Sequence, residues 1–489
     1  MTPCTLLMQN PPHELTVLRR TTILLSSTQT RRASLTSQKP AAETHGIDFV
    51  PLSERYGTPM RLFTIWFSSN LTILGVALGA IGVVAGLSLT WAILALALGN
   101  MIGTFIMAAH SAQGPQLGVP QMIQSRAQFG VVGAAVPLVA VAVMYLLYCA
   151  ANGILILSAV RQLVPVGADT ALVLFATATG LIAYYGYELI HRIGKILSVV
   201  SSAFFLLAAC LLLYKHSAQT GALLHSAGHF SGAAFAITVT QAAAWSLTYG
   251  PYVADYSRYL PPEVSVAKTF WFTALGNFLG TAVVMSLGAC LAAVDPPAAD
   301  NSVAAVAGLF GIAKPAALLF LCVGVIQGNT LTLYSAYLSC VTIVSGKGGA
   351  QPVRKNAKLL LIGFLVTLAA GISFFAQDNF NTYFADALNV MIYLLIPWSA
   401  INLTDYYFVR KGHYQVADFY RPDGQYGSCQ WWTLAVFALG ILVQIPFVSL
   451  SFFHGVFFRD TGADFAWLPG LLVSAGAYLA VHRISPRFS

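Results

Sequence analysis

Long apolar runs recur along this chain of 489 residues and constrain its fold more than any other feature. Hydrophobic residues make up 57% of the sequence and charged residues 9%, whereas an ordinary soluble domain carries about 25% charged residues. A run of about 20 apolar residues is long enough to cross the hydrocarbon core of a bilayer as an α-helix. The sequence therefore predicts an all-α polytopic membrane protein.

Twelve such runs are predicted to be transmembrane helices, and Asp386 is the only charged residue within them. They lie near residues 62–84, 89–109, 134–160, 170–187, 196–214, 232–254, 269–292, 315–343, 359–376, 383–404, 432–453 and 466–481.

The distribution of basic residues predicts the orientation. If the N-terminus is cytoplasmic, 21 of the 25 Lys and Arg residues fall in cytoplasmic segments. Such an excess in short loops marks the cytoplasmic side of a membrane protein. We expect both termini in the cytoplasm and a location in the plasma (cytoplasmic or inner) membrane. The formal net charge of +8 follows from this asymmetry, so no nucleic-acid partner is expected.

Residues 1–45 differ from the rest, because they are rich in Ser, Thr and Arg and poor in acidic residues. We expect a disordered tail here. An organelle transit peptide or a start codon assigned too early would explain the same composition. The membrane domain is predicted over residues 46–484.

One predicted span contains residues that interrupt a helix. The stretch 231–260 is apolar but carries Gly250 and Pro251, and Asp255 and Arg258 lie near its end. In hydrocarbon every backbone polar group must be paired, so a break is tolerated only where the freed groups face protein or a water-filled cavity. Broken membrane helices are typical of transport sites.

The first predicted span shares these features. It is interrupted by glycines, including Gly75 and Gly79, and carries the polar Asn70 at mid-depth. Interrupted helices at positions 1 and 6 indicate two inverted five-helix repeats followed by two additional helices. The repeats are predicted over residues 46–215 and 231–410, and the additional helices over 431–482. The alternative is that the glycines only allow close helix packing.

Other functional classes are disfavoured. The seven cysteines show no disulfide or zinc spacing, and His225 and His229 alone make a weak metal-ligand set. An enzyme would need a nucleophile with its base, or metal ligands, inside the bilayer, and a channel would need a continuous polar pore. The predicted spans offer neither. We expect no enzymatic activity, no metal and no organic cofactor.

Four segments stand out by their order and spacing. They are GPQLGVPQMIQSRAQFG at 114–130, VADYSRYLP at 253–261, GNTLTLYSAYLSC at 328–340 and PWSAINLTDYYFVRKGHY at 397–414. Together they resemble motifs of the nucleobase:cation symporter family, purine-cytosine permease branch. The resemblance implies a leucine-transporter-type fold of twelve helices, a substrate held between segments 1, 3, 6, 8 and 10, and cation-driven uptake.

A flat heteroaromatic base is best held by aromatic rings and amides. Stacking on a ring contributes about 1–3 kcal/mol per base, and Asn or Gln matches the donors and acceptors of the base edge. Tyr148 and Asn152 lie one turn apart on one face of segment 3. The resemblance implies stacking on Tyr148 and on Trp245 of segment 6, and base contacts by Asn152 and by Asn329 of segment 8.

Two candidates keep an alternative. Asn70 of segment 1 is a further candidate base contact, but it would equally cap the broken helix. Tyr148 stands where several relatives have Trp, and a packed core ring is its alternative role.

Segment 8 bears on the coupling ion. The resemblance implies that sodium-coupled members carry two adjacent hydroxyl residues there, whereas Gln327 and Gly328 stand just before Asn329. Thr330 and Thr332 are nearby candidates but do not form an adjacent pair. We therefore favour a co-transported proton (H+) and keep sodium (Na+) open.

A transported proton needs a titratable group, and carboxylates inside the membrane are the first candidates. Asp386 lies near the outer end of segment 10, where a solvated helix end is the alternative. Asp255 with Arg258, and Glu188 with Arg192, lie at inner helix ends and are predicted ion pairs of an inner gate.

The resulting hypothesis is a symporter that imports a nucleobase, such as cytosine or a purine, by alternating access. A related ring compound such as allantoin, hydantoin, a nucleoside or a pyridoxine-like vitamin would suit the same pocket. The expected partners are this small molecule, the coupling cation and the lipid bilayer.

Overall fold

The computed structural model describes residues 47–489 except 186, 227, 346–354 and 485–489. Residues 47–489 form one compact unit. The tail predicted at 1–45 lies outside the described residues.

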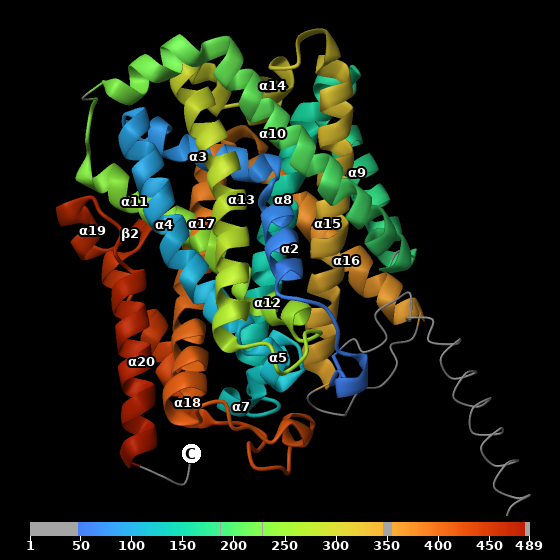
Figure 1. Ribbon diagram of the computed structural model, residues 1–489, viewed down its shortest axis with the longest axis vertical. Helices are drawn as coiled ribbons and strands as arrows, with labels where there is room; N and C mark the ends of the chain where they lie inside the picture. The colour runs from blue at the N-terminus through green and yellow to red at the C-terminus, as the bar shows by residue number, and fades with distance from the viewer. Residues whose placement is uncertain (1–46, 186, 227, 346–354, 485–489) are drawn as a thin grey trace, which may run out of the picture. The chain divides into compact units, whose positions relative to one another are not determined.

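The described chain is helical apart from one hairpin, as the sequence predicts (Figure 1). The hairpin pairs β1 (Ser449–Leu450) with the antiparallel β2 (Phe453–His454). The α-helices are α2 (Met60–Asn70), α3 (Ile73–Val84), α4 (Leu89–Ser111), α5 (Gly114–Leu117), α6 (Gln121–Gln124), α7 (Arg126–Phe129), α8 (Ala135–Leu163), α9 (Ala168–Tyr185), α10 (Tyr187–His225), α11 (Gly232–Leu247), α12 (Gly250–Ser257), α13 (Val266–Val294), α14 (Ser302–Gly308), α15 (Lys314–Ser345), α16 (Lys355–Ala376), α17 (Phe380–Thr404), α18 (Trp431–Leu442), α19 (Val456–Thr461) and α20 (Trp467–Ile484). Short 3-10 helices are η1 (Leu52–Glu54), η2 (Pro296–Ala299), η3 (Gly311–Ala313), η4 (Gln377–Asn379), η6 (Val416–Tyr420) and η7 (Ile445–Phe447), and η5 (Asp405–Val409) is π-helical.

Each predicted apolar run contains a helix or a pair of helices. Within the described ranges, six helical stretches are long and apolar enough to cross a membrane, or seven if α2 and α3 count as one broken span. One of the six, Lys355–Val409, contains both α16 and α17. The helix predicted over 432–453 is too long at its C-terminal end, because α18 ends at Leu442 and Pro446 follows in η7. Proline lacks the backbone N–H that continuing the α-helix would need.

The first break lies between α2 and α3, which are bent by 65°. Leu71 leaves the helical conformation, and the Thr72 side chain caps α3 by accepting a hydrogen bond from Gly75 N at 3.3 Å. A threonine hydroxyl suits this position because it pairs one of the N–H groups left free at a helix start. Gly75 and Gly79 lie inside α3, which corrects the predicted position of the break.

The two glycines instead allow α3 to approach α13 closely. A Cβ added at Gly79 would lie 2.0 Å from the carbonyl oxygen of Met285, and one at Gly288 would lie 1.9 Å from that of Val76. Small residues at such crossings let membrane helices pack backbone against backbone. The packing alternative therefore accounts for the glycines.

The second break separates α11 from α12 at Thr248 and Tyr249. Gly250 and Pro251 form the first turn of α12. Proline is tolerated there because its missing N–H would have no partner within the helix. The interruption lies where the sequence predicts it.

A near-identical segment occurs in α4 and in α13. Residues 97–105 read ALGNMIGTF, and residues 274–282 read ALGNFLGTA. The glycines of the α4 copy meet the backbone of α11, and those of the α13 copy meet the backbone of α2. The same local sequence therefore makes the same kind of contact with each broken helix.

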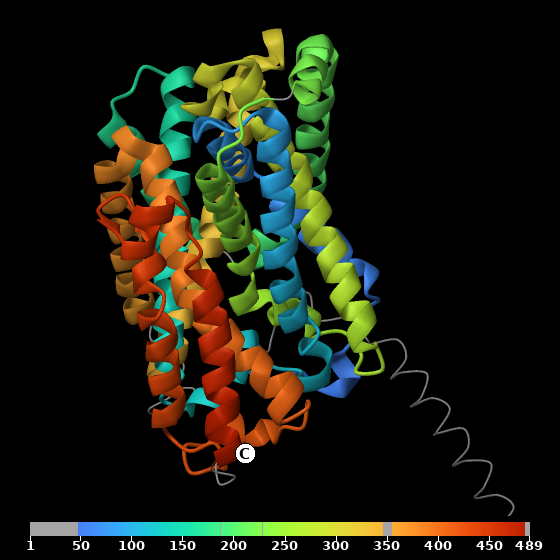
Figure 2. The same ribbon diagram turned by 90° about the vertical axis from the view of Figure 1, so that its left-hand side faces the viewer.

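The helices form two packed groups. The broken helices pack with α4 and α13, whereas α8, α9, α15 and α16 pack against one another. The C-terminal helices α18 and α20 pack beside α17, on one side of the bundle (Figure 2).

The α3–α13 crossing yields a stability prediction. Gly79→Ala should lower the free energy of unfolding by about 1–3 kcal/mol, because its Cβ meets backbone that cannot swing aside. The melting temperature of the purified protein in detergent measures this. Gly476→Ala on α20 is the matched control, since no atom lies within 4 Å of its added Cβ. Equal melting temperatures for the two variants would contradict the prediction.

Candidate functional site

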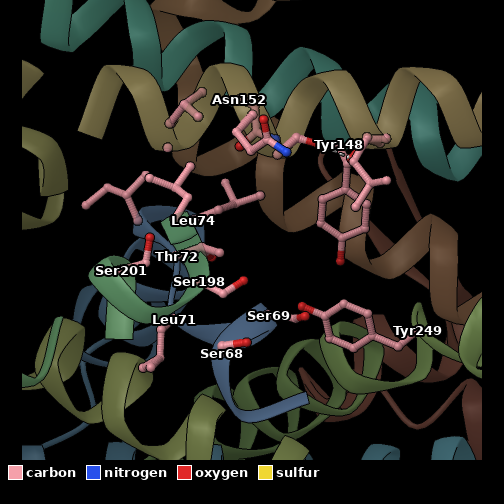
Figure 3. A pocket seen from close by; sticks show the side chains of 18 of the residues that line it. Ser68, Ser69, Leu71, Thr72, Leu74, Tyr148, Asn152, Ser198, Ser201 and Tyr249 are labelled. Atoms are coloured by element: carbon pink, nitrogen blue, oxygen red, sulfur yellow. Dashed lines mark hydrogen bonds between the residues drawn. The ribbon is translucent and has the colours of Figure 1, made fainter. Parts of the chain in front are cut away.

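A cavity of about 280 Å³ lies beside both helix breaks (Figure 3). Its walls come from α2, α3, α8, α10, α11, α12 and α15. Among the described residues that line it, none is charged. The polar lining residues are Ser68, Ser69, Thr72, Asn152, Ser198, Ser201, Thr248, Gln327 and Thr332, together with tyrosines. A small, largely apolar cavity with a few polar groups suits a small uncharged molecule.

Tyr148 and Asn152 line this cavity from one face of α8, as the sequence predicts (Figure 3). The Tyr148 hydroxyl shares a 2.9 Å hydrogen bond with Thr248 Oγ1 in the second break. Asn152 Nδ2 donates to Asn329 Oδ1 at 3.4 Å. Asn329 is buried and is not among the lining residues. The structure therefore places Asn329 behind Asn152 as its amide partner.

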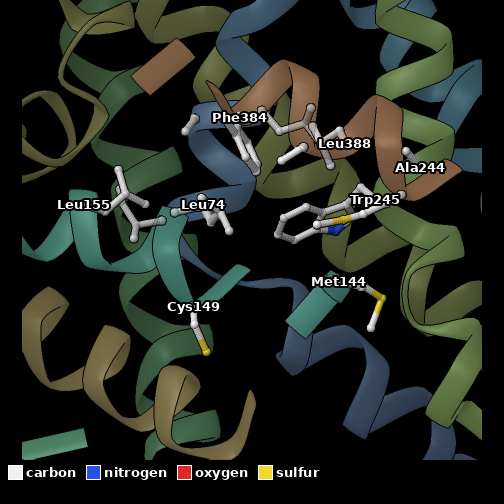
Figure 4. Packing of buried hydrophobic residues seen from close by; sticks show 14 of the residues in the cluster. Leu74, Met144, Cys149, Leu155, Ala244, Trp245, Phe384 and Leu388 are labelled. Carbon is white, nitrogen blue, oxygen red and sulfur yellow. The ribbon is translucent and has the colours of Figure 1, made fainter. Parts of the chain in front are cut away.

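Trp245 lines the cavity from the last turn of α11. Its ring stands nearly perpendicular to that of Tyr148, with centroids 5.8 Å apart and an interplanar angle of 83°. It also belongs to a buried apolar cluster with Leu74, Phe384 and Leu388 (Figure 4). A flat molecule stacked on one of the two rings would present its edge to the other.

Asn70 lies behind Trp245 and not in the cavity wall. Its side chain is fully buried, and its Oδ1 accepts a 2.9 Å hydrogen bond from Trp245 Nε1. Its Nδ2 donates to Trp66 O at 2.7 Å and to Asn277 Oδ1 at 2.9 Å. In this geometry Asn70 orients the indole ring.

Asn70 is one end of a buried polar hub, defined here as Asn70, Asn100, Thr104, Ser246, Asn277 and Thr281. Asn277 Nδ2 donates to Thr104 Oγ1 at 2.6 Å and to Ser246 Oγ at 2.9 Å. Asn100 Oδ1 accepts from Ser246, Thr281 and Thr104. Asn100 with Thr104, and Asn277 with Thr281, are equivalent positions of the two near-identical segments. Those repeated segments were the sequence signal that would have located the hub.

The inner half of the second broken helix adds an aromatic wall that sequence reasoning missed. Tyr249, Tyr252 and Tyr256 all line the cavity, and their ring centroids lie 5.3, 6.2 and 5.4 Å from that of Trp66. The available signal was their spacing of three and four residues, which puts them on one helical face.

The candidate ion residues lie apart from one another. The hydroxyls of Thr330 and Thr332 donate within α15, to Ile326 O at 2.8 Å and to Gly328 O at 2.9 Å. Thr332 lines the cavity and Thr330 does not. Asp386 accepts hydrogen bonds from the backbone N, at 2.9 Å, and the hydroxyl of Ser451. Its contacts tie α17 to the hairpin, away from the cavity.

The residues assigned to an inner gate are only partly described. Asp255 Oδ1 accepts from Gln121 N at 2.9 Å, which ties α12 to α6. Buried Arg258 donates to Asp48 O at 3.0 Å and to the backbone oxygen of Asp255 at 3.3 Å. The side chain of Glu188 lies outside the described residues. The motif segments 114–130 and 253–261 thus meet through Asp255.

The sequence of this chain is similar to those of known permeases. Residues 49–470 match a family model described as permease for cytosine/purines, uracil, thiamine, allantoin. The chain is 38% identical over 443 residues to "Putative purine-cytosine permease YxlA" of Bacillus subtilis, covering 90% of this chain and 96% of that protein. It is 26% identical over 406 residues to purine-cytosine permease FCY2 of Saccharomyces cerevisiae, covering 76% and 72%.

Solved structures agree on the fold. The inward-facing conformation of Mhp1 superposes with a TM-score of 0.74 at 19% identity, covering 92% of this chain and 96% of that one. Mhp1 in a closed conformation with bromovinylhydantoin bound gives 0.69 at 18% identity, covering 92% and 98%. Mhp1 is described there as a nucleobase-cation-symport-1 family transporter.

The Asn70–Trp245 contact yields a stability prediction. Trp245→Phe should lower the free energy of unfolding by about 1–3 kcal/mol more than Trp66→Phe, because it leaves Asn70 Oδ1 buried without a donor. Both indoles are buried, but Trp66 Nε1 has no hydrogen-bond partner among the described residues. Thermal unfolding in detergent measures both variants. Adding Asn70→Ala to each should remove most of the difference, and a difference that persists would count against the contact.

Proposed function

The chain belongs to the family of permeases for cytosine and purines, uracil, thiamine and allantoin, and we propose that it imports a nucleobase such as cytosine or a purine. Transport is by alternating access and is coupled to a cation. Its relatives are permeases and transporters, which supports a transport role.

The uncharged cavity carries this proposal. Its described lining combines aromatic rings with hydroxyls and amides and holds no charged group. A nucleobase is flat, uncharged and rimmed with donors and acceptors, so it matches such a lining. A charged substrate would lose its hydration without gaining a counter-charge, which costs several kcal/mol.

Trp245 and Tyr148 are the proposed stacking rings, and Asn152, held by Asn329, the proposed amide contact. The Asn152–Asn329 bond at 3.4 Å is long, so a base edge can replace it with little loss. Asn70 acts on the substrate through Trp245. Whether the cavity holds a single-ring or a double-ring base depends on how these side chains adjust around it.

A proton is the proposed coupling ion, with sodium as the second candidate. Thr330 and Thr332 use their hydroxyls within α15 and do not form an adjacent pair. That arrangement disfavours the hydroxyl pair of a sodium site. The contacts of Asp386 with Ser451 favour its alternative role at a helix end.

The proposed architecture is twelve spans, arranged as two inverted five-helix repeats and two additional helices. Helix contacts support it. In an inverted repeat, span n matches span n+5, so that α2 with α3 matches α11 with α12, α4 matches α13, α8 matches α15, and α9 matches α16. The packing of α4 on α11 then has its counterpart in the packing of α13 on α2 and α3. The packing of α8 on α16 has its counterpart in the packing of α15 on α9. All of these contacts are present, and the repeated segments of α4 and α13 occupy equivalent positions.

We place both termini in the cytoplasm and the protein in the plasma membrane, following the basic residues. In that orientation α2 and α12 are the inner halves of the two broken helices, and both contribute to the cavity lining together with α3 and α11, the outer halves. Asp255 and Arg258 anchor α12 at that inner end.

A related ring compound is the second candidate substrate. Allantoin occurs in the family description, and the Mhp1 structure contains a hydantoin. Both contain a hydantoin ring, which is small, nearly flat and has amide-like edges. A nucleoside or a pyridoxine-like vitamin is larger or carries more hydroxyl groups.

Uptake in cells tests the substrate class. Cells expressing the chain should accumulate at least one of radiolabelled cytosine, adenine, uracil, allantoin and hydantoin above cells carrying an empty vector. Accumulation of none of them would refute the proposed substrate class.

Ring truncation tests the site. Trp245→Ala and Tyr148→Ala should each weaken substrate affinity roughly 5- to 150-fold, as loss of one stacking contact predicts. The KM of uptake measures the effect. Trp432→Ala, on the exposed face of α18, should leave the KM unchanged. If neither cavity variant changes uptake at equal expression, the rings do not stack on the substrate.

Ion replacement tests the coupling. Uptake should survive replacement of sodium by choline and should fall when a protonophore collapses the proton gradient. Loss of uptake in choline alone would establish sodium instead.

A further inference from the structure

Asp464 is a buried carboxylate that the sequence interpretation did not single out. It lies in the loop between α19 and α20, at residues 462–466. Its side chain has 0% exposure. Gly462 adopts a positive φ of 65° at the end of α19, and a Cβ added there would lie 3.1 Å from the Cβ of Ala233 in α11. The loop therefore turns inward and brings a carboxylate into the protein.

Asp464 joins three separate elements. Its Oδ2 accepts a hydrogen bond from the hydroxyl of Tyr393, in the middle of α17. Its Oδ1 accepts from Ala466 N at 3.0 Å, and its backbone oxygen accepts from Thr240 Oγ1 of α11 at 3.0 Å. Thr240 precedes Trp245 by five residues, or about 7.5 Å along the helix. The junction thus ties α17 to the helix that carries the proposed stacking ring.

The surroundings favour the protonated acid. Burial raises the pKa of Asp464 to about 6, although hydrogen bonds from Tyr393, Ala466 and Ser449 act in the opposite direction. The side-chain oxygens of Asn389 and Gln444 are buried and accept no hydrogen bond from the described residues. Asn389 donates to Ser449 O and Gln444 to Tyr393 O, so both belong to this junction. Two buried acceptors of this junction thus lack a donor among the described residues, and a protonated carboxyl group is itself a donor.

No nearby described cation compensates the carboxylate. The α11 and α18 helices carry no charged residue, and Asp386 of α17 bonds Ser451. His454, Arg459 and Asp460, on the hairpin and α19, are exposed. The remaining titratable groups on the packed elements are Tyr383 and Tyr393 of α17 and Tyr478, His482 and Arg483 of α20.

We propose that Asp464 is a proton-binding site, and that its protonation holds the 462–466 loop between α11 and α17 and thereby keeps the outer half of the second broken helix in place. The proposal deepens the proposed transport function and rests on it for its role in the cycle. Protonation from outside then favours the state that is closed outward and open to the cytoplasm. Loss of the proton favours release of the loop.

The pH dependence has a definite sign. An opened, hydrated loop would titrate near the ordinary aspartate value of about 3.9, whereas the docked loop titrates at about 6. Docking is therefore strongest below about pH 4, weakens about tenfold per pH unit up to about pH 6, and then levels off. The whole change in the opening equilibrium is about 100-fold.

Hydrogen–deuterium exchange of the purified full-length protein tests this without any substrate. Peptides covering 456–470 are followed between about pH 4.5 and pH 7.5, with rates corrected for the intrinsic effect of pH. Protection should fall with rising pH in the wild type. Asp464→Asn mimics the protonated acid and should stay protected throughout. Tyr393→Phe removes a donor to the ionised form and should move the transition to higher pH.

Asp460→Asn is the matched control, because Asp460 is an exposed carboxylate four residues earlier, and it should behave as the wild type. A flat wild-type profile, or the same pH dependence in Asp464→Asn, would overturn the proposal. Because no nucleobase is present, failure of the transport proposal would leave this result unchanged, so the two proposals fail separately.

Discussion

The pairing of backbone polar groups in a bilayer is the constraint on which this structure depends. Two helices are interrupted, and each break leaves N–H and C=O groups that lipid cannot satisfy. The Thr72 hydroxyl caps the first break, and a proline with no N–H to lose begins the helix after the second. At the second break the N–H groups of Thr248 and Tyr249 donate to Ala244 O and Ser246 O, and residues of both breaks line the cavity. The cavity therefore lies where both helices are interrupted.

The buried polar hub pairs further polar groups beside the cavity. Asn277 and Asn100 join the two broken helices to α4 and α13 through side-chain hydrogen bonds. Glycines at the same crossings let the backbones come close enough for these short side chains to meet. Trp245 is oriented at the edge of this hub by Asn70. The proposed stacking ring is thus hydrogen-bonded to the helices that the hub joins.

Sequence patterns located three side chains that line the cavity, and their contact with a substrate stays a prediction. Tyr148 and Asn152 share a helical face, and Trp245 precedes a visible break, so cavity-lining positions followed from spacing and resemblance. Asn70 and Asn329 were expected to touch the substrate, but each lies one layer behind the cavity wall, bonded to a lining residue. Spacing along one helix identifies a face but not the depth at which a neighbouring helix covers it.

The sequence by itself determined the class of molecule, because apolar runs of membrane length and low charge leave a helical membrane protein as the workable fold. It also determined the second helix break, since Gly250 and Pro251 act locally. Only the tertiary structure decided that Gly75 and Gly79 serve helix packing, that two distant copies of one segment meet in a hub, and that Asp464 is buried beside Tyr393. Those properties arise from contacts between residues far apart in the chain, and such contacts form only when the helices have packed.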